Sequence, residues 1–166
     1  MRRLIMTILA SAVMCFAAEA QSNLKKVYDE SIDPMTQIDN AISEADRDGK
    51  FVICQVGGNW CRWCLMFADF ISKDSEITEL IDKNFEYIHV NYNPRERNDE
   101  SKMKKAEAML ARLGNPGRFG YPVFVVLDGD GKVIHIQDSS LLEEGNGYNK
   151  SKVMRFFSNW TPEAVK

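Results

Sequence analysis

The chain is poor in the residues that bind metal ions or nucleic acids. Its 166 residues include only two histidines and four cysteines, and 24 acidic residues outnumber 21 basic ones, for a formal net charge of −3. A weakly acidic chain with no basic block argues against a nucleic-acid partner. The sequence also has no internal repeat and no low-complexity tract. The chain is long enough for one domain with its own hydrophobic core.

Long apolar runs are absent except at the N-terminus. There Met1-Arg2-Arg3 precedes an apolar stretch from Leu4 to Phe16, and Ala18-Glu19-Ala20 offers the small residues of a signal-peptidase site. This pattern is typical of a secretory signal peptide, and the run is short for a membrane span. We therefore predict a signal peptide over residues 1–20, an exported mature protein and no stable membrane insertion after cleavage. The periplasm is the expected compartment, with secretion and an uncleaved N-terminal anchor as alternatives.

Hydrophobic periodicity divides the rest of the chain into helices and strands. Residues 21–32 show no such pattern and are expected to form a loosely held leader before a single domain over residues 33–166. The polar stretch 143–149 is expected to be a loop. The expected helices lie at 34–48, 60–71, 75–83, 100–113 and 151–160, and the expected strands at 51–56, 85–91, 122–127 and 132–137.

The alternation of these elements predicts an α/β fold. Strands separated by helices pair in parallel through right-handed crossovers, whereas the last two strands are joined by the turn Asp128-Gly129-Asp130-Gly131 and pair antiparallel. The expected architecture is a three-layer sandwich, in which a central mixed sheet is flanked by helices on both faces.

Two of the cysteines are neighbours in the segment Gly58-Asn-Trp-Cys-Arg-Trp-Cys64. Cys61 follows a buried strand and opens a helix, where free backbone N–H groups and the helix dipole stabilise a thiolate. Cys64 lies one turn further on, close enough to form a disulfide with Cys61. Arg62 adds a positive charge, which is expected to lower the pKa of Cys61 and to make the pair more oxidising. The pattern favours a pair of working thiols.

A metal site and a structural disulfide are the alternatives for this pair. A zinc site needs further ligands, but His89 and His135 lie far apart in predicted strands and Cys54 is the only other thiol of the mature chain. A structural disulfide would close a very small loop and would stabilise the fold little. Cys54 alternates with Gln55 along its strand, so it is expected on the opposite face as an inert apolar residue. We predict no metal site.

The order of the motifs resembles the thioredoxin superfamily. A strand, then Trp-Cys-X-X-Cys at a helix start, then Gly-X-Pro before a strand–turn–strand occurs here at residues 51–56, 60–64 and 120–131. The chain is similar in particular to exported thioredoxin-like proteins of Gram-negative bacteria and to the C-terminal domain of DsbD-type electron transporters. The resemblance spans roughly residues 35–160 and implies a thioredoxin-like sandwich.

The resemblance also implies roles for individual residues. Cys61 would be the nucleophile that forms a mixed disulfide, and the more buried Cys64 would be the resolving thiol. Pro122 would be a cis-proline facing the pair, and a cis X–Pro bond is rare enough to mark a fixed structural purpose. The alternative is a trans proline at the start of an edge strand. The backbone of Tyr121 would pair with the bound substrate strand. Trp60 would shield the site, or would simply pack in the core.

Two residues depart from the better-known members of the superfamily. Trp63 replaces a small residue or a histidine, and it either contacts the substrate or folds back over its helix. Gln55 stands where thioredoxin has a buried aspartate that accepts the proton of the second cysteine. A glutamine cannot act as a general base. Resolution by Cys64 is then expected to be slower, or another carboxylate is expected to serve.

Together these features predict an exported thiol–disulfide oxidoreductase that acts on protein disulfides. No cofactor is expected, because the dithiol itself carries the electrons, and a membrane thiol transporter would recharge a reductase. Arg62 favours an oxidising pair, whereas the resemblance favours reduction, and we expect the reductase direction. One alternative is a redox-inactive binding module that uses Tyr121, Trp60 and Trp63 as an adhesive surface. Another is delivery of a metal, or a role in haem maturation, through the thiols.

Overall fold

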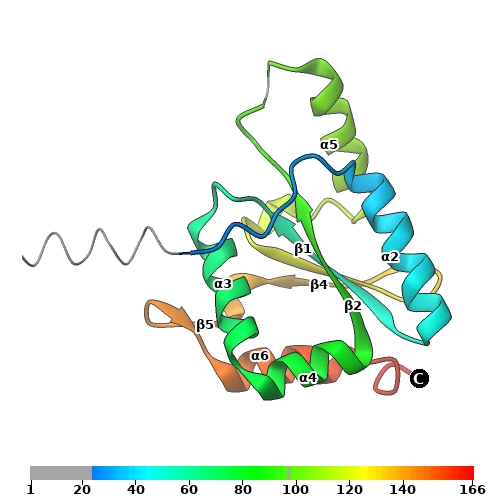
Figure 1. Cartoon of the computed structure of the whole chain (residues 1–166), viewed down its shortest axis with the longest axis vertical. Coiled ribbons are helices and arrows are strands. Elements are labelled where there is room, and N and C mark those ends of the chain that lie inside the picture. The colour runs from blue at the N-terminus through cyan, green and yellow to red at the C-terminus, as the bar shows by residue number, and fades with distance from the viewer. Residues whose placement is uncertain (1–23, 97) are drawn as a thin grey trace, which may run out of the picture.

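The computed structural model describes residues 24–96 and 98–166 (Figure 1). The predicted signal peptide and Arg97 lie outside this range, as do the first residues of the leader. Within the described part, no helix has both the length and the apolar character needed to cross a membrane.

The helices and strands follow the predicted order, with boundaries that agree within a few residues. The α-helices of the described part are α2 (Pro34–Asp48), α3 (Arg62–Lys73), α4 (Ser75–Asn84), α5 (Glu100–Arg112) and α6 (Lys150–Asn159). Its strands are β1 (Phe51–Gly57), β2 (Phe85–Asn91), β3 (Val123–Leu127), β4 (Val133–Asp138), β5 (Glu143–Glu144) and β6 (Gly147–Tyr148). Two short 3-10 helices complete the list, η1 (Pro116–Phe119) and η2 (Ser139–Leu142).

Local signals at the helix ends account for several of these boundaries. The Asp33 side chain accepts hydrogen bonds from the backbone N–H groups of Met35 and Thr36, and Pro34 occupies the first turn, where its missing N–H costs nothing. Gly49 ends α2 in the left-handed conformation at φ 66°, which suits a residue without a Cβ.

The four long strands form one mixed sheet in the order β2-β1-β3-β4. β1 pairs parallel with β2, and β3 pairs antiparallel with β4, as predicted. β3 runs antiparallel to β1, so the parallel pairing expected for strands separated by helices is wrong for β3. The two central strands, β1 and β3, are buried almost throughout. The carboxyl end of β1, which leads directly to the cysteine pair, is therefore anchored in the middle of the sheet.

Each face of the sheet is covered by its own hydrophobic cluster, which confirms the three-layer sandwich. On one face, residues of α2 and α5 such as Ile38 and Met109 pack against the β1 side chains Val52 and Cys54. The other face carries α3, α4 and α6, whose buried residues pack against Ile53 and Phe124. Figure 1 shows α2 and α3 on opposite sides of β1 and β2.

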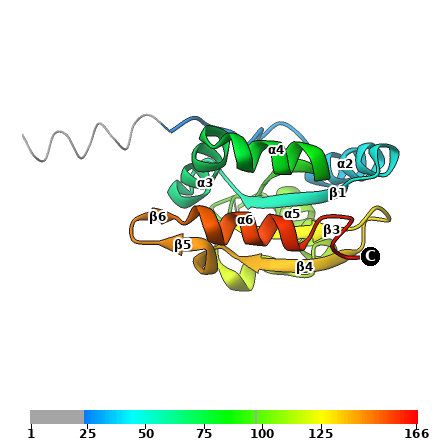
Figure 2. The same cartoon turned by 90° about the horizontal axis from the view of Figure 1, so that it is seen from below.

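Two predictions about irregular segments are wrong. The leader is not loosely held where it is described, because the Tyr28 side chain is buried and the N–H groups of Val27 and Tyr28 both lie 3.2 Å from the Asn59 Oδ1 that accepts them. The polar stretch after Leu142 is not a plain loop. It forms the β5–β6 hairpin, which Figure 2 shows beside α6 at the end of the molecule where α3 lies.

Candidate active site

Cys61 is the N-cap residue of α3, and a disulfide joins it to Cys64 with 5.2 Å between the two Cα atoms. The backbone N–H of Cys64 donates a hydrogen bond to Cys61 Sγ at 3.2 Å. N–H groups in the first turn of a helix have no intrahelical partner, so the sulfur takes the place that an aspartate or serine oxygen takes at other helix starts. The same N–H would stabilise a thiolate on Cys61 when the disulfide is reduced.

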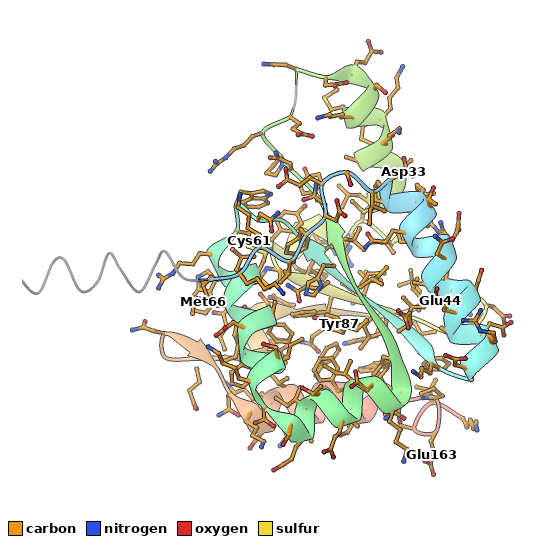
Figure 3. The ribbon with its side chains drawn as sticks, viewed as in Figure 1. Asp33, Glu44, Cys61, Met66, Tyr87 and Glu163 are labelled. Atoms are coloured by element: carbon orange, nitrogen blue, oxygen red, sulfur yellow. A yellow bond between two sulfur atoms is a disulfide. The ribbon has the colours of Figure 1, made fainter. Side chains whose placement is uncertain are left out.

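The two sulfur-bearing residues differ in exposure. Cys61 keeps 7% of its surface accessible, whereas Cys64 is fully buried one turn into α3. Figure 3 shows Cys61 at the end of α3 that faces away from α4 and α6. An incoming disulfide therefore meets Cys61 first.

Trp60, Tyr121 and Tyr92 form an aromatic flank, in which Trp60 and Tyr121 pack against the pair and Tyr92 contacts Tyr121. The Tyr121–Pro122 peptide bond is cis, and the Tyr121 ring packs against the cluster that contains both cysteines. The Trp60 ring lies edge-on to Tyr121 at 5.8 Å between centroids, and Trp60 Nε1 donates to the Tyr92 carbonyl oxygen at 2.7 Å. Tyr92, a residue that the sequence did not point to, stacks on Tyr121 at 5.1 Å. The structure thus brings Trp60 and Tyr121 together beside the pair, next to the cis bond that precedes Pro122.

The two residues between the cysteines face different surroundings. Arg62 is exposed in the first turn of α3. Trp63 folds back over the protein, because its ring lies edge-on to Tyr148 at 5.6 Å and its carbonyl oxygen accepts a hydrogen bond from the Tyr148 hydroxyl at 3.1 Å. Of the two orientations left open by the sequence, the structure has the packed one.

Gln55 is fully buried behind the pair, and both ends of its amide are hydrogen-bonded. Its Nε2 donates to the Cys64 carbonyl oxygen at 2.9 Å and to the Tyr28 hydroxyl at 2.7 Å. Its Oε1 accepts from the Tyr87 hydroxyl at 2.6 Å. Gln55 therefore ties together the first turn of α3, the leader and β2.

The structure offers no buried substitute for the missing aspartate. In the part of the chain that is described, the buried polar residues are Gln55, Ser139 and Thr161, and no carboxylate is buried. The buried Tyr28 hydroxyl, which accepts a hydrogen bond from Gln55, is a further polar group behind the pair. It lies in the leader, where no periodicity or motif marks it, and only its burial in the folded chain reveals it.

Cys54 lies on the other face of β1, in the cluster that α2 and α5 cover, as its alternation with Gln55 predicted. Burial raises the pKa of its thiol to about 12, so it stays protonated and unreactive at neutral pH. Among the described residues, no group of three or more histidine, cysteine, aspartate or glutamate side chains is arranged to hold a metal ion.

A cavity of about 400 Å³ lies near the pair but does not include it. It is lined by the leader, by the segment that follows β2 and by α5, and it shares only Tyr92 with the aromatic flank. Neither cysteine lines this cavity, so the cavity does not hold the reacting sulfurs.

Gly57, the last residue of β1, leaves room for the buried side of the pair. A Cβ at this position would come within 3.0 Å of both Cys64 Sγ and the Tyr28 hydroxyl oxygen. We expect Gly57→Ala to lower the free energy of unfolding by about 1–3 kcal/mol, because these groups would have to shift. Chemical denaturation measures the effect. Gly129→Ala is the matched control, since a Cβ there meets nothing within 4 Å, and an equal loss in both variants would contradict the expectation.

Comparison with known proteins places this geometry in a family. The model of the family Thioredox_DsbH, described as "Protein of unknown function, DUF255", matches residues 15–156. Among solved structures, the chain is similar to a disulphide isomerase from Xylella fastidiosa Temecula1, with 27% sequence identity and a TM-score of 0.67 over 82% of this chain and 97% of that chain.

A second structure, titled DsbH Oxidoreductase, shares the fold at 20% identity with a TM-score of 0.52, over 81% of this chain and 84% of that one. Among proteins with curated functions, no match was found. The fold predicted from the sequence is confirmed, and so is the enzyme class. The chain belongs to the Thioredox_DsbH family of the thioredoxin superfamily, and it is a thiol–disulfide oxidoreductase.

Proposed function

We propose that the protein is exported and reduces disulfides in protein substrates through the Cys61–Cys64 dithiol. The observation that carries this proposal is the position of Cys61. Its sulfur caps α3 and accepts the Cys64 N–H, and Cys61 is the more exposed residue of the two. This arrangement stabilises the attacking thiolate and hides the second thiol until the first has reacted.

The proposed cycle starts from the reduced pair. The Cys61 thiolate attacks one sulfur of the substrate disulfide, which forms a mixed disulfide and releases the other substrate sulfur as a thiolate that takes up a proton. Cys64 then loses its proton and attacks Cys61 Sγ, which releases the second substrate thiol and leaves the Cys61–Cys64 disulfide. Two electrons pass from the dithiol to the substrate, so the cycle needs no further cofactor.

The aromatic flank supports a polypeptide substrate. Tyr121 lies before the cis peptide bond and beside the pair, where its backbone would pair with an extended substrate segment. Trp60 and Tyr92 hold the Tyr121 ring from two sides, by an edge-on contact and by stacking. Such a preorganised surface lowers the entropy cost of binding a flexible segment.

The partner that returns electrons to the oxidised pair is proposed to be a membrane thiol transporter. An exported reductase works where the surroundings are oxidising, so its disulfide has to be reduced again from the cytosolic side. The N-terminal pattern of residues 1–20 supports export. Fusing residues 1–20 to a phosphatase that is active only outside the cytosol would test it, because an inactive fusion contradicts export.

Direction and activity are tested together on the protein that starts at Gln21. We expect it to accelerate the reduction of insulin by dithiothreitol and to have a reduction potential nearer the thioredoxin value of about −270 mV than the DsbA value of about −120 mV. Active protein with a potential near −120 mV would make it an oxidase. Failure to accelerate insulin reduction, with a disulfide that reagents do not reduce, would leave the redox-inactive binding module that the sequence allowed.

A further inference from the structure

The leader carries Tyr28 to the buried side of the cysteine pair. Its side chain is 4% exposed and belongs to the same hydrophobic cluster as Cys61 and Cys64. The backbone there is fixed on both sides, because Asn59 accepts from the Tyr28 N–H at 3.2 Å and donates to the Tyr28 carbonyl oxygen at 2.8 Å. Asn59 is two residues from Cys61, so the leader and the active-site loop are held as one unit.

The hydrogen bonds of Gln55 determine where the proton of Tyr28 can go. The Cys64 carbonyl oxygen can only accept, so the Gln55 amide nitrogen must face it, and the same nitrogen donates to the Tyr28 hydroxyl. Tyr28 is therefore an acceptor in that bond and keeps its own proton for another group. Tyr87 is the opposite case, because its hydroxyl proton is donated to Gln55 Oε1.

The sulfur of Cys64 and the Tyr28 hydroxyl border the same space beside Gly57. Both the sulfur and the hydroxyl oxygen come within 3.0 Å of the point that a Gly57 Cβ would occupy. They thus flank the same small space beside β1, which stays open because residue 57 is a glycine. A thiolate on Cys64 would place an anion at the edge of this space, where the Tyr28 hydroxyl could donate to it.

We propose that Tyr28 is a further catalytic residue, whose hydroxyl donates a hydrogen bond to the Cys64 thiolate and thereby assists the resolving step. The proposal rests on the dithiol cycle proposed above. In the mixed disulfide, the Cys64 thiol loses its proton to water, its thiolate attacks Cys61 Sγ, and the departing substrate thiolate takes a proton from water. Tyr28 keeps its own proton throughout. Its hydroxyl takes over part of the role of the buried aspartate that thioredoxin has at the position of Gln55.

The group proposed to stabilise the Cys64 thiolate is a neutral hydrogen-bond donor, the Tyr28 hydroxyl. Burial raises the pKa of Tyr28 above its ordinary value, so the hydroxyl remains protonated at any physiological pH. No carboxylate is buried in the part of the chain that the structure describes. Cys61, Tyr28 and Tyr121 belong to the same hydrophobic cluster as Cys64, and the exposed Arg62 lies in the same turn of α3. Behind Gln55, β2 contributes Tyr87, which donates to Gln55, and His89, whose ring contacts Tyr28.

The test measures the pKa of Cys64 in Cys61→Ser protein, by the ultraviolet absorbance of the thiolate. Adding Tyr28→Phe is expected to raise this pKa by about one to two units, because a hydrogen bond to an anion is lost. Tyr87→Phe is the matched control, since it removes one hydroxyl from the same network but not the one that faces the sulfur. A shift of equal size in both variants, or no shift in Tyr28→Phe, would overturn the proposal.

Two further readouts complement the measurement of the Cys64 pKa. With Cys61 present, Tyr28→Phe is expected to slow the release of substrate from the mixed disulfide about 3- to 10-fold at pH 7, with the difference vanishing at high pH. In Cys61→Ser protein with Tyr28 intact, the ring Cζ resonance of Tyr28 is expected to move as Cys64 titrates, and an unmoved resonance contradicts the proposal. The titration needs no substrate, so a failure to reduce insulin would count against the proposed function alone.

Discussion

Cys61→Ser is expected to lower the rate of insulin reduction by about a thousandfold or more, to the level of dithiothreitol alone. A serine hydroxyl at the helix N-cap remains protonated at neutral pH and does not attack a disulfide, whereas the cysteine thiolate does. The variant is expected to fold, since a serine is also a good N-cap residue and can accept the Cys64 N–H.

Cys64→Ser is expected to fail at a later step. Cys61 remains able to attack the substrate, but the mixed disulfide has no internal thiol to resolve it. Non-reducing gel electrophoresis and mass spectrometry of the variant with oxidised insulin should show a covalent adduct at Cys61. The two serine variants thus differ in which species accumulates, although both lose turnover.

Cys54→Ala provides the control for removing a thiol. Cys54 lies in the core on the far face of β1, so its loss is expected to lower stability slightly and to leave the rate of insulin reduction unchanged.

Equal activity of wild-type and Cys61→Ser protein would contradict the assignment of Cys61. The absence of an adduct in Cys64→Ser, with Cys61 present and reduced, would contradict the two-step cycle.

The sequence predicted those parts of the site that depend on local interactions. A cap, the proline after it and the glycine at the end of α2 act within one turn of a helix, so Asp33, Pro34 and Gly49 mark its boundaries without reference to the rest of the chain. Local signals also place Cys61 at a helix start, because β1 ends at Gly57 and Gly58 follows it. Alternation along β1 likewise placed Cys54 and Gln55 on opposite faces of the sheet.

The rest of the site depends on contacts between segments that are distant in the chain. Tyr28 and Gln55 are 27 residues apart and meet only because the leader crosses the end of β1. Trp63 is oriented by Tyr148, 85 residues away, on a hairpin whose sequence shows no strand alternation. Neither pairing leaves a periodic or compositional trace, so sequence reasoning treated the leader as loose and left Trp63 undecided.

Stability near pH 5 is expected to depend on His89, the fifth residue of β2. Its ring lies edge-on between those of Tyr28 and Tyr87, at 5.3 and 5.5 Å between centroids. Its Nε2 is buried without a hydrogen-bond partner among the described residues. Burial disfavours the charged form and lowers the pKa of His89 from 6.5 to about 4.

The sign of the effect follows from the lowered pKa. Between pH 6.5 and 4 the unfolded chain binds a proton at His89 that the folded chain does not, so the stabilisation is fully present above pH 6.5 and is lost as the pH falls to about 4. The loss is about 3 kcal/mol, since each pKa unit corresponds to about 1.4 kcal/mol. A hydrogen bond from Lys105 lowers the pKa of Asp33 from 3.8, and one from Lys150 lowers the pKa of Asp74 from the same value. These two carboxyls therefore change the stability of the fold at a lower pH than His89 does.

Glu86 acts in the opposite direction, because burial raises the pKa of its carboxyl above 4.5 and its stabilisation is lost as the pH rises. This contribution cancels when two variants that share Glu86 are compared. The measurement is therefore the free energy of unfolding in urea at pH 7.5 and pH 4.5 for wild-type and His89→Phe protein. Phenylalanine keeps an aromatic ring between the two tyrosines and removes the titrating group.

We expect the wild-type protein to lose about 2–3 kcal/mol more than His89→Phe between these two pH values. His135→Phe makes the same chemical change on β4, where the ring stacks on Trp160 at 4.1 Å, and controls for the substitution itself. An identical pH dependence in wild-type and His89→Phe protein would mean that the imidazole accepts a proton in the folded state.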